Sequence, residues 1–98
     1  MTEQWTLERV LELVEGDREL VEQLWEIGVC ERSDEGFSAR EVELVRVAHV
    51  LVRELDVNWP GVEIILRLRS ELIDTRRQIA ELLELVQKTR DPGDGPAG

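Results

Sequence analysis

Apolar residues recur at spacings of three and four over the first quarter of the chain, which is the period of a helix with one buried face. Thr6 can cap a first helix, and Trp5 before it can pack on Val10. Gly16 ends this helix, and Asp17 can cap a second one. The pattern predicts two short helices joined at a Gly-Asp corner, as in a helix-turn-helix. Their inward-facing residues are expected to be Leu7, Val10, Leu11, Val14, Leu20, Val21, Leu24 and Ile27.

A polar stretch separates these two helices from a third. Gly28 ends the second helix, and residues 29–36 read as a short loop or miniature hairpin that resembles a stunted wing. Ser38 and Glu41 then have the spacing of a capping box, so a third helix is predicted from here to about Leu55. Its apolar residues cover most of its circumference, which is typical of the central helix of a small bundle.

The sequence Asp56–Gly61 interrupts the helical pattern and opens a long final helix. Asn58 can cap this helix, and Pro60 fits its first turn, where a missing N–H has no cost. The helix is predicted to run from about Trp59 to Thr89. The last residues, 91–98, have no apolar side chain of a size to bury and are expected to form a disordered tail after a single domain over residues 1–90.

Apolar residues of the final helix form a heptad seam, with alternating steps of three and four residues. Thr75 occupies one place in this seam. The seam predicts pairing of two copies into a homodimer. The alternative is that the same face docks back on the domain, which accounts for residues 65–73 but leaves residues 79–86 without a core to cover. The predicted dimerisation residues are Ile65, Leu68, Leu72, Ile79, Leu82 and Val86.

The net charge is −10, and the acidity is concentrated in the first third of the chain. Residues 1–36 contain 11 acidic and 3 basic residues, whereas residues 37–90 contain 9 of each. An acidic surface repels a phosphate backbone and attracts cationic protein surfaces, so direct nucleic-acid binding is not expected. Solubility alone is the simpler interpretation of the same charge. The outward faces of the first two helices are expected to carry Glu8, Glu12 and Glu15, then Glu19, Glu22 and Glu26.

The chain offers little chemistry for catalysis. It contains one histidine, one cysteine, no tyrosine, and no glycine-rich phosphate loop or metal-ligand spacing, so we expect no enzyme activity, metal or cofactor. Cys30 is expected to be a reduced, partly buried apolar residue, and His49 a core or boundary residue. No apolar stretch approaches the roughly 20 residues of a membrane span, and no basic segment leads into an apolar run, so a cytoplasmic location is expected.

The order of helix-turn-helix, short wing and helix resembles the N-terminal domain of the MerR family of transcription regulators. The stretch EIGVCERSDEGFSAREVELVRVAHVLVREL carries this resemblance. It implies an all-α, MerR-like winged-helix domain with a long C-terminal dimerisation helix. In MerR regulators the second helix and the wing bring Arg and Tyr to DNA, whereas the second helix here carries glutamates and the wing holds Asp34 and Glu35.

The stretch RELDVNWPGVEIILRLRSEL is similar to the CbpM family of chaperone modulators, mainly through the Trp59-Pro60-Gly61 corner before the final helix. That resemblance covers most of the chain. It implies a cytoplasmic homodimer that binds the J domain of a DnaJ-like co-chaperone called CbpA and restrains its co-chaperone activity and DNA binding. J domains present a basic helix to DnaK, which an acidic two-helix surface would complement.

The predicted function is therefore a protein-binding modulator, an inhibitor, of a DnaJ/CbpA-type co-chaperone. Trp25 is a candidate anchor in the interface, and a role in the core is equally open for it. A MerR-like DNA-binding regulator is the alternative function, and a dimeric scaffold without a regulatory role is a third. The predicted partner-binding residues are Glu8, Glu12, Glu15, Glu19, Glu22, Trp25 and Glu26.

Overall fold

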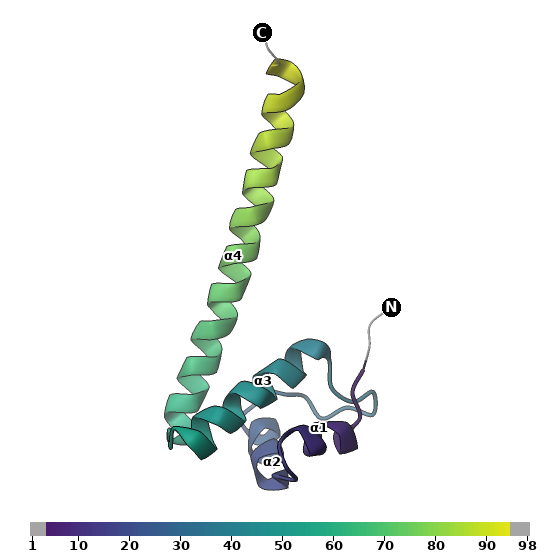
Figure 1. Ribbon diagram of the computed structural model, residues 1–98, viewed down its shortest axis with the longest axis vertical. Coiled ribbons are helices and arrows are strands. Elements are labelled where there is room, and N and C mark those ends of the chain that lie inside the picture. Colours follow the sequence, from purple (N-terminus) through teal and green to yellow (C-terminus); the bar gives the residue numbers. More distant parts are fainter. Residues whose placement is uncertain (1–3, 95–98) are drawn as a thin grey trace. The chain divides into compact units, whose positions relative to one another are not determined.

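The computed structural model describes residues 4–94, with side chains through residue 89. Over these residues the fold is all-α, as predicted. The elements in chain order are α1 (Leu7–Leu13), α2 (Arg18–Glu26), α3 (Ala39–His49), the π-helical turn η1 (Val50–Glu54) and α4 (Trp59–Asp94). Figure 1 labels the α-helices. The chain divides into two compact units, Met1–Leu66 and Arg67–Gly98. That residues 1–90 form a single domain stays a prediction.

Side-chain caps begin the first two helices at the predicted residues. The Thr6 hydroxyl oxygen accepts a hydrogen bond from the Arg9 N–H at 3.2 Å, and a carboxylate oxygen of Asp17 accepts one from the Leu20 N–H at 3.2 Å. Each bond satisfies a backbone donor that the first turn of a helix leaves without a partner.

The later helices also begin as predicted. Ser38 accepts from the Glu41 N–H at 3.1 Å and the Glu41 carboxylate accepts from the Ser38 N–H at 3.0 Å, which completes the capping box of α3. Asn58 accepts from the Gly61 N–H at 2.9 Å in the first turn of α4.

The core of the first unit lies where α3 packs on both α1 and α2. Leu24, Val45 and Val62 have no exposed surface at all. The predicted inward faces of α1 and α2 are confirmed, because each of their residues is buried or packs partly buried against the core. Helix α4 contributes its first two turns through Val62 and Leu66. The buried cluster consists of Val10, Val14, Leu20, Val21, Leu24, Cys30, Phe37, Val42, Leu44, Val45, Ala48, Leu51, Val62 and Leu66.

Helix α1 ends earlier than the apolar pattern indicated. It ends at Leu13, and the chain reverses through Glu15 (φ 59°) and Gly16 (φ 79°). The prediction that placed Glu15 on the outer face of the first helix is therefore wrong, since this residue lies in the turn before α2. The reason is that the left-handed turn at Gly16 already begins at the residue before it.

The third helical segment reaches Glu54, close to the predicted end at Leu55, but its last turn is wider than an α-helix. The α-helical part ends at His49, and the Leu55 N–H donates to the carbonyl of Val50 at 3.1 Å, a π-helical bond. Asp56 follows with a φ of 57°, and this left-handed residue ends the segment.

Residues 29–36 form a loop, the first of the two forms expected for the wing. The segment after it pairs with the N-terminus, because Trp5 and Phe37 exchange two backbone hydrogen bonds of 2.8 Å. Gly36 makes this close approach possible. Its φ is +88°, and a Cβ at this position would collide with the carbonyl of Trp5.

Helix α4 extends to Asp94, past the end predicted near Thr89 and into the first residues of the expected disordered tail. The prediction placed the end near Thr89 because residues 91–98 have no apolar side chain of a size to bury. Helical backbone needs no surface to cover, so the lack of large apolar side chains after Thr89 does not by itself end the helix, although Pro92 in its last turn has no N–H and adds no backbone hydrogen bond. Residues 95–98 of the expected tail lie outside the described residues.

Candidate functional site

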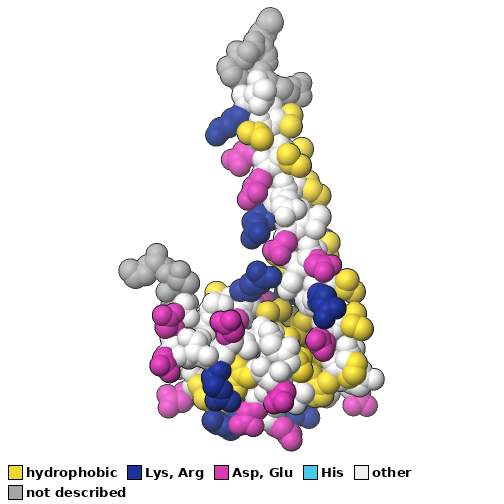
Figure 2. Space-filling model, turned by 180° about the vertical axis from the view of Figure 1, so that it is seen from behind, with side chains coloured by type: hydrophobic (Ala, Val, Ile, Leu, Met, Phe, Trp, Pro, Cys, Tyr) yellow, Lys and Arg dark blue, Asp and Glu magenta, His cyan; other side chains and the backbone are white. Residues whose placement is uncertain are grey.

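The predicted acidic residues of the first unit all lie at the surface. Figure 2 shows Asp and Glu side chains spread over the face drawn, with Lys and Arg side chains among them. None of the six contributes to the buried core. The exposed glutamates are Glu8 and Glu12 on α1, Glu15 in the turn, and Glu19, Glu22 and Glu26 on α2.

Two of the α2 glutamates interact with arginines of the same chain. Glu22 lies 3.2 Å from Arg18, one turn earlier on α2, and Glu19 lies 3.8 Å from Arg53 of η1. These exposed pairs stabilise the fold only slightly. They matter for binding, because a basic partner has to compete with arginines that are already present. Glu26 has no such pair within the described part of the chain.

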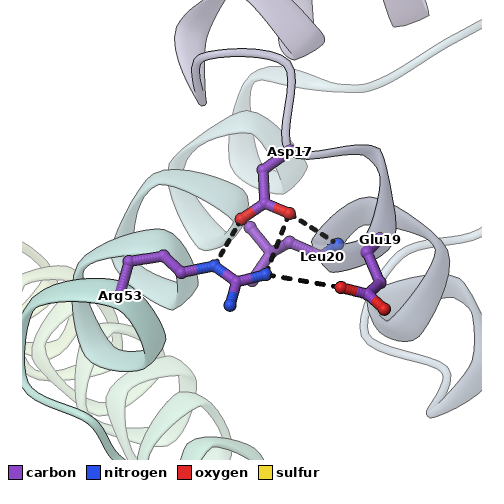
Figure 3. Close-up of polar contacts among 4 residues, drawn as sticks. All are labelled: Asp17, Glu19, Leu20 and Arg53. Carbon is purple, nitrogen blue, oxygen red and sulfur yellow. Dashed lines mark hydrogen bonds and ion pairs between the residues drawn. The ribbon is translucent and has the colours of Figure 1, made fainter.

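Asp17 connects the corner between α1 and α2 to η1 (Figure 3). Its two carboxylate oxygens accept hydrogen bonds from the Arg53 guanidinium at 2.6 and 3.0 Å, a bidentate pair, while one of them also caps α2. The bond from Arg53 is the main cause that lowers the pKa of Asp17. Burial opposes this shift, and the bond from the Leu20 N–H adds to it. The sequence gives no direct signal for this pair, since its residues are 36 positions apart.

Trp25 lies between the core and the surface. Its ring stacks on Phe37 with a centroid distance of 5.9 Å, and the Arg32 guanidinium covers it at 3.9 Å from the ring centroid. The side chain is half-buried and packs against the core cluster. Trp25 thus has a role in packing, and its use as an anchor for a partner stays a prediction.

A depression of about 610 Å³ lies beside this tryptophan. It brings together Glu22 and Glu26 of α2 with Glu31, a loop residue that the sequence analysis did not select. The Glu31 backbone N–H donates to the Glu41 carboxylate at 2.9 Å, which ties the loop to α3. Three carboxylates here attract a cationic side chain, but Arg32 also lines the depression and already covers the tryptophan ring.

Cys30 lines the same depression but is itself buried, with 2% of its surface exposed. Loss of solvation, and secondarily the charge of Glu41, raises the pKa of Cys30 to about 12. A thiol with this pKa is protonated at neutral pH and is a poor nucleophile. The cysteine acts as a small apolar core residue, as predicted.

The predicted seam of α4 is exposed along its whole length. Its six apolar residues are between 37% and 60% exposed, and Figure 2 shows hydrophobic side chains along one side of this helix. Leu83 and Leu85, each 59% exposed, widen this apolar face near its C-terminal end. The seam residues are Ile65, Leu68, Leu72, Ile79, Leu82 and Val86.

The described part of the chain contains no group of three or more His, Cys, Asp or Glu side chains placed to hold a metal ion. No helix among the described residues is long and apolar enough to cross a membrane. Comparisons with protein-family models, with curated proteins and with solved structures each find no match to this chain.

Proposed function

We propose that this protein is a binding module that uses the acidic surface of α1 and α2 to hold a basic protein surface. Its partner in this proposal is the J domain of a DnaJ/CbpA-type co-chaperone, whose activity the bound protein restrains. The observation that carries the proposal is the exposure of all six glutamates on these helices and their turn. The resemblance of the sequence to CbpM chaperone modulators supports the choice of partner.

The depression beside Trp25 is the place on this surface best suited to a basic side chain. Glu22, Glu26 and Glu31 lie around it and supply negative charge, while the indole supplies a flat apolar surface. Charged groups at the edge of an interface mainly speed and orient association, and packed aromatic residues supply much of the affinity. A lysine or arginine of the J domain that enters this depression would meet the carboxylates, and it would have to displace Arg32 to reach the face of the indole that Arg32 covers.

A DNA-binding role is the alternative, since two consecutive short helices, α1 and α2, are compatible with a helix-turn-helix. In that motif the second helix reads the major groove, and neutralised phosphates supply much of the affinity. The exposed side chains of α2 include Glu19, Glu22 and Glu26 and only one arginine, Arg18. Such a helix repels a phosphate backbone, so we favour a protein partner.

The second part of the proposal is that two copies pair through α4. The heptad seam is exposed in the single chain, and apolar residues in this pattern are buried when two helices pair. A small domain also gains stability from such an interface. The paired state would present two acidic surfaces, one from each copy.

A titration separates the two functions. The full chain is titrated by calorimetry with a purified J domain of a CbpA-type co-chaperone and, separately, with duplex DNA, each at 50 and 200 mM salt. The proposal predicts J-domain binding that weakens as salt rises, and no DNA binding at either salt. Tight DNA binding at low salt that is lost steeply at high salt, without J-domain binding, would establish the alternative.

A further inference from the structure

The indole ring of Trp25 has two contacts of different kinds. Phe37 stacks on it with a centroid distance of 5.9 Å, is only 2% exposed, and exchanges two backbone hydrogen bonds with Trp5. This contact belongs to the core. The other contact is the guanidinium of Arg32, an exposed loop residue, which lies 3.9 Å from the ring centroid. The core therefore fixes the ring in place, while a surface side chain covers it.

The cover over the ring is weakly held. Within the described part of the chain, the Arg32 side chain makes no hydrogen bond or ion pair besides its contact with the indole. An exposed contact of a cation with an aromatic ring favours the covered state by only about two- to fivefold. Exposed side chains also change rotamer within nanoseconds. Arg32 can therefore leave the ring without any change in the fold.

Arg32 borders two depressions that both reach the tryptophan. Besides the depression of about 610 Å³ described above, a second one of about 240 Å³ lies on the side of the loop and Phe37. Trp25, Glu31 and Arg32 line both of them, and Asp34 adds a further carboxylate to the second. Rotation of Arg32 away from the ring would open the indole to a ligand from either side.

The indole N–H of Trp25 is a second, independent feature that points to a ligand. The nitrogen is buried, and no group among the described residues accepts a hydrogen bond from it. Buried tryptophan N–H groups usually have an acceptor, and one without an acceptor costs free energy in the folded state. An arginine in a partner chain carries both a guanidinium for the ring and main-chain carbonyl oxygens that can accept from this N–H.

We propose that the covered face of Trp25 is a binding site for an arginine side chain of a basic partner, and that Arg32 occupies it as an internal ligand until the partner's arginine displaces it. The identity of the partner rests on the proposed function, whereas the site itself does not. Arg32 demonstrates the fit, because a guanidinium already lies over the ring. The nearby carboxylates attract any cation, but a planar, weakly hydrated guanidinium stacks on an aromatic ring better than an ammonium group does. The site is therefore selective for arginine over lysine.

An NMR titration tests the site without a partner protein. The three tryptophans of the full chain give three indole N–H signals, and Trp25→Phe identifies the signal of Trp25. The labelled protein is titrated with Nα-acetyl-arginine amide and, separately, with the corresponding lysine compound. In Arg32→Gln the Trp25 signal should move at an arginine concentration about two- to fivefold lower than in the parent, because no internal ligand competes. The lysine compound should bind more weakly.

Two further variants separate the cover from the charge of Arg32. Arg32→Lys keeps the charge but loses the planar group, so its affinity for the arginine compound should lie between those of the parent and Arg32→Gln. Arg9→Gln is the matched control. Arg9 lies 4.0 Å from the ring centroid of Trp5, so this substitution removes the same charge from the same kind of contact outside both depressions. It should leave the response of the Trp25 signal unchanged.

Three results of this titration would overturn the inference. If the Trp25 signal does not respond to the arginine compound in Arg32→Gln, the covered face is not a binding site. An Arg32→Lys protein with the parent affinity would show that charge alone sets binding, and Arg32 would then not be an internal ligand. An equal gain in Arg9→Gln and Arg32→Gln would lead to the same conclusion.

Calorimetry with the J domain connects the site to the proposed function. Arg32→Gln should bind the J domain about two- to fivefold more tightly than the parent, and Arg9→Gln should match the parent. Equal J-domain affinities in all three proteins would keep the proposed function but overturn the use of this site by the partner. No J-domain binding in any of them, with the arginine compound still favouring Arg32→Gln, would overturn the choice of partner and support the arginine site.

Discussion

At the scale of single residues, Asp17 joins two parts of the first unit. One carboxylate oxygen caps α2 through the Leu20 N–H, and the two oxygens together bind the guanidinium of Arg53 on η1. Each function needs a different property of the side chain. The cap requires an acceptor oxygen, while the bond to Arg53 is strengthened by the negative charge. Substitutions at this position can therefore separate the two contributions.

Asp17→Asn should make stability less dependent on pH. The pKa of Asp17 is lowered in the folded protein, so its charge stabilises the fold above the unfolded pKa of about 3.9, and this stabilisation is lost as pH falls through the folded pKa. Asparagine keeps a capping oxygen but does not titrate. Urea unfolding should show the parent protein as the more stable at pH 7, with the difference shrinking as the pH falls below the unfolded pKa of about 3.9. Asp17→Ala, which also removes the cap, should cost about 1 kcal/mol more at every pH. A gap between the parent and Asp17→Asn that stays constant down to pH 2 would contradict the assignment.

At the scale of elements, the sequence was sufficient to predict where the helices begin. Thr6, Asp17, Ser38 and Asn58 each accept a backbone hydrogen bond in the first turn of the expected helix. A cap acts within three residues, so its signal is entirely local. The amphipathic pattern likewise identified the buried faces, because apolar residues at helical spacing have to lie on one side.

Features that depend on tertiary contacts were not predictable in the same way. The bond between Asp17 and Arg53 joins residues 36 positions apart, and the bridge between Trp5 and Phe37 joins the segment before α1 to the segment before α3. Helix ends were also less accurate, as the early turn at Glu15 and the π-helical turn η1 show. In the candidate site, the exposure of the glutamates followed from the pattern. The pattern did not predict that Glu19 pairs with an arginine of η1 or that Glu31 lines the depression beside Trp25. Both features depend on how the loop and η1 fold back.

The capping box of α3 gives a stability prediction at this scale. Ser38→Ala removes the acceptor for the Glu41 N–H and should lower the free energy of unfolding by about 1 kcal/mol in urea titrations. Ser33→Ala is the matched control, because the Ser33 hydroxyl accepts only from the Glu35 N–H within an exposed loop. The control should change stability by less than half as much. Equal effects of the two substitutions would mean that the box does not stabilise α3.

At the scale of the whole molecule, the exposed seam of α4 predicts self-association that depends on register. Leu72 and Ile73 are neighbours with similar exposure, 50% and 46%, but only Leu72 lies in the seam. Leu72→Asp should bury a charge in the paired state and give monomers, whereas Ile73→Asp should leave the dimer largely intact. Sedimentation velocity over a range of concentrations measures both. Dissociation by Ile73→Asp alone would show that another face of the helix forms the interface.

Charge distribution links this paired form to the proposed function. The excess of acidic over basic residues lies in residues 1–36, while residues 37–90 are neutral overall. The seam of α4 contains none of the glutamates of α1 and α2, so the proposed pairing does not use these residues. The two activities of the chain, self-association and partner binding, therefore rest on different residues and can be removed one at a time.

The most direct test of the central claim is to reverse charge on the acidic surface without disturbing the fold. Glu12 and Glu26 suit this purpose, because both are exposed, neither has an ion pair within the described residues, and each lies near the C-terminal end of its helix, where lysine is tolerated. The matched control is Glu81→Lys with Glu84→Lys, which changes the net charge equally on α4. In calorimetric titration against the J domain, the Glu12→Lys, Glu26→Lys protein should bind about tenfold more weakly at low salt, with a smaller salt dependence, while the control keeps the parent affinity. Equal affinities for the parent protein and the Glu12→Lys, Glu26→Lys protein at both ionic strengths would contradict the account.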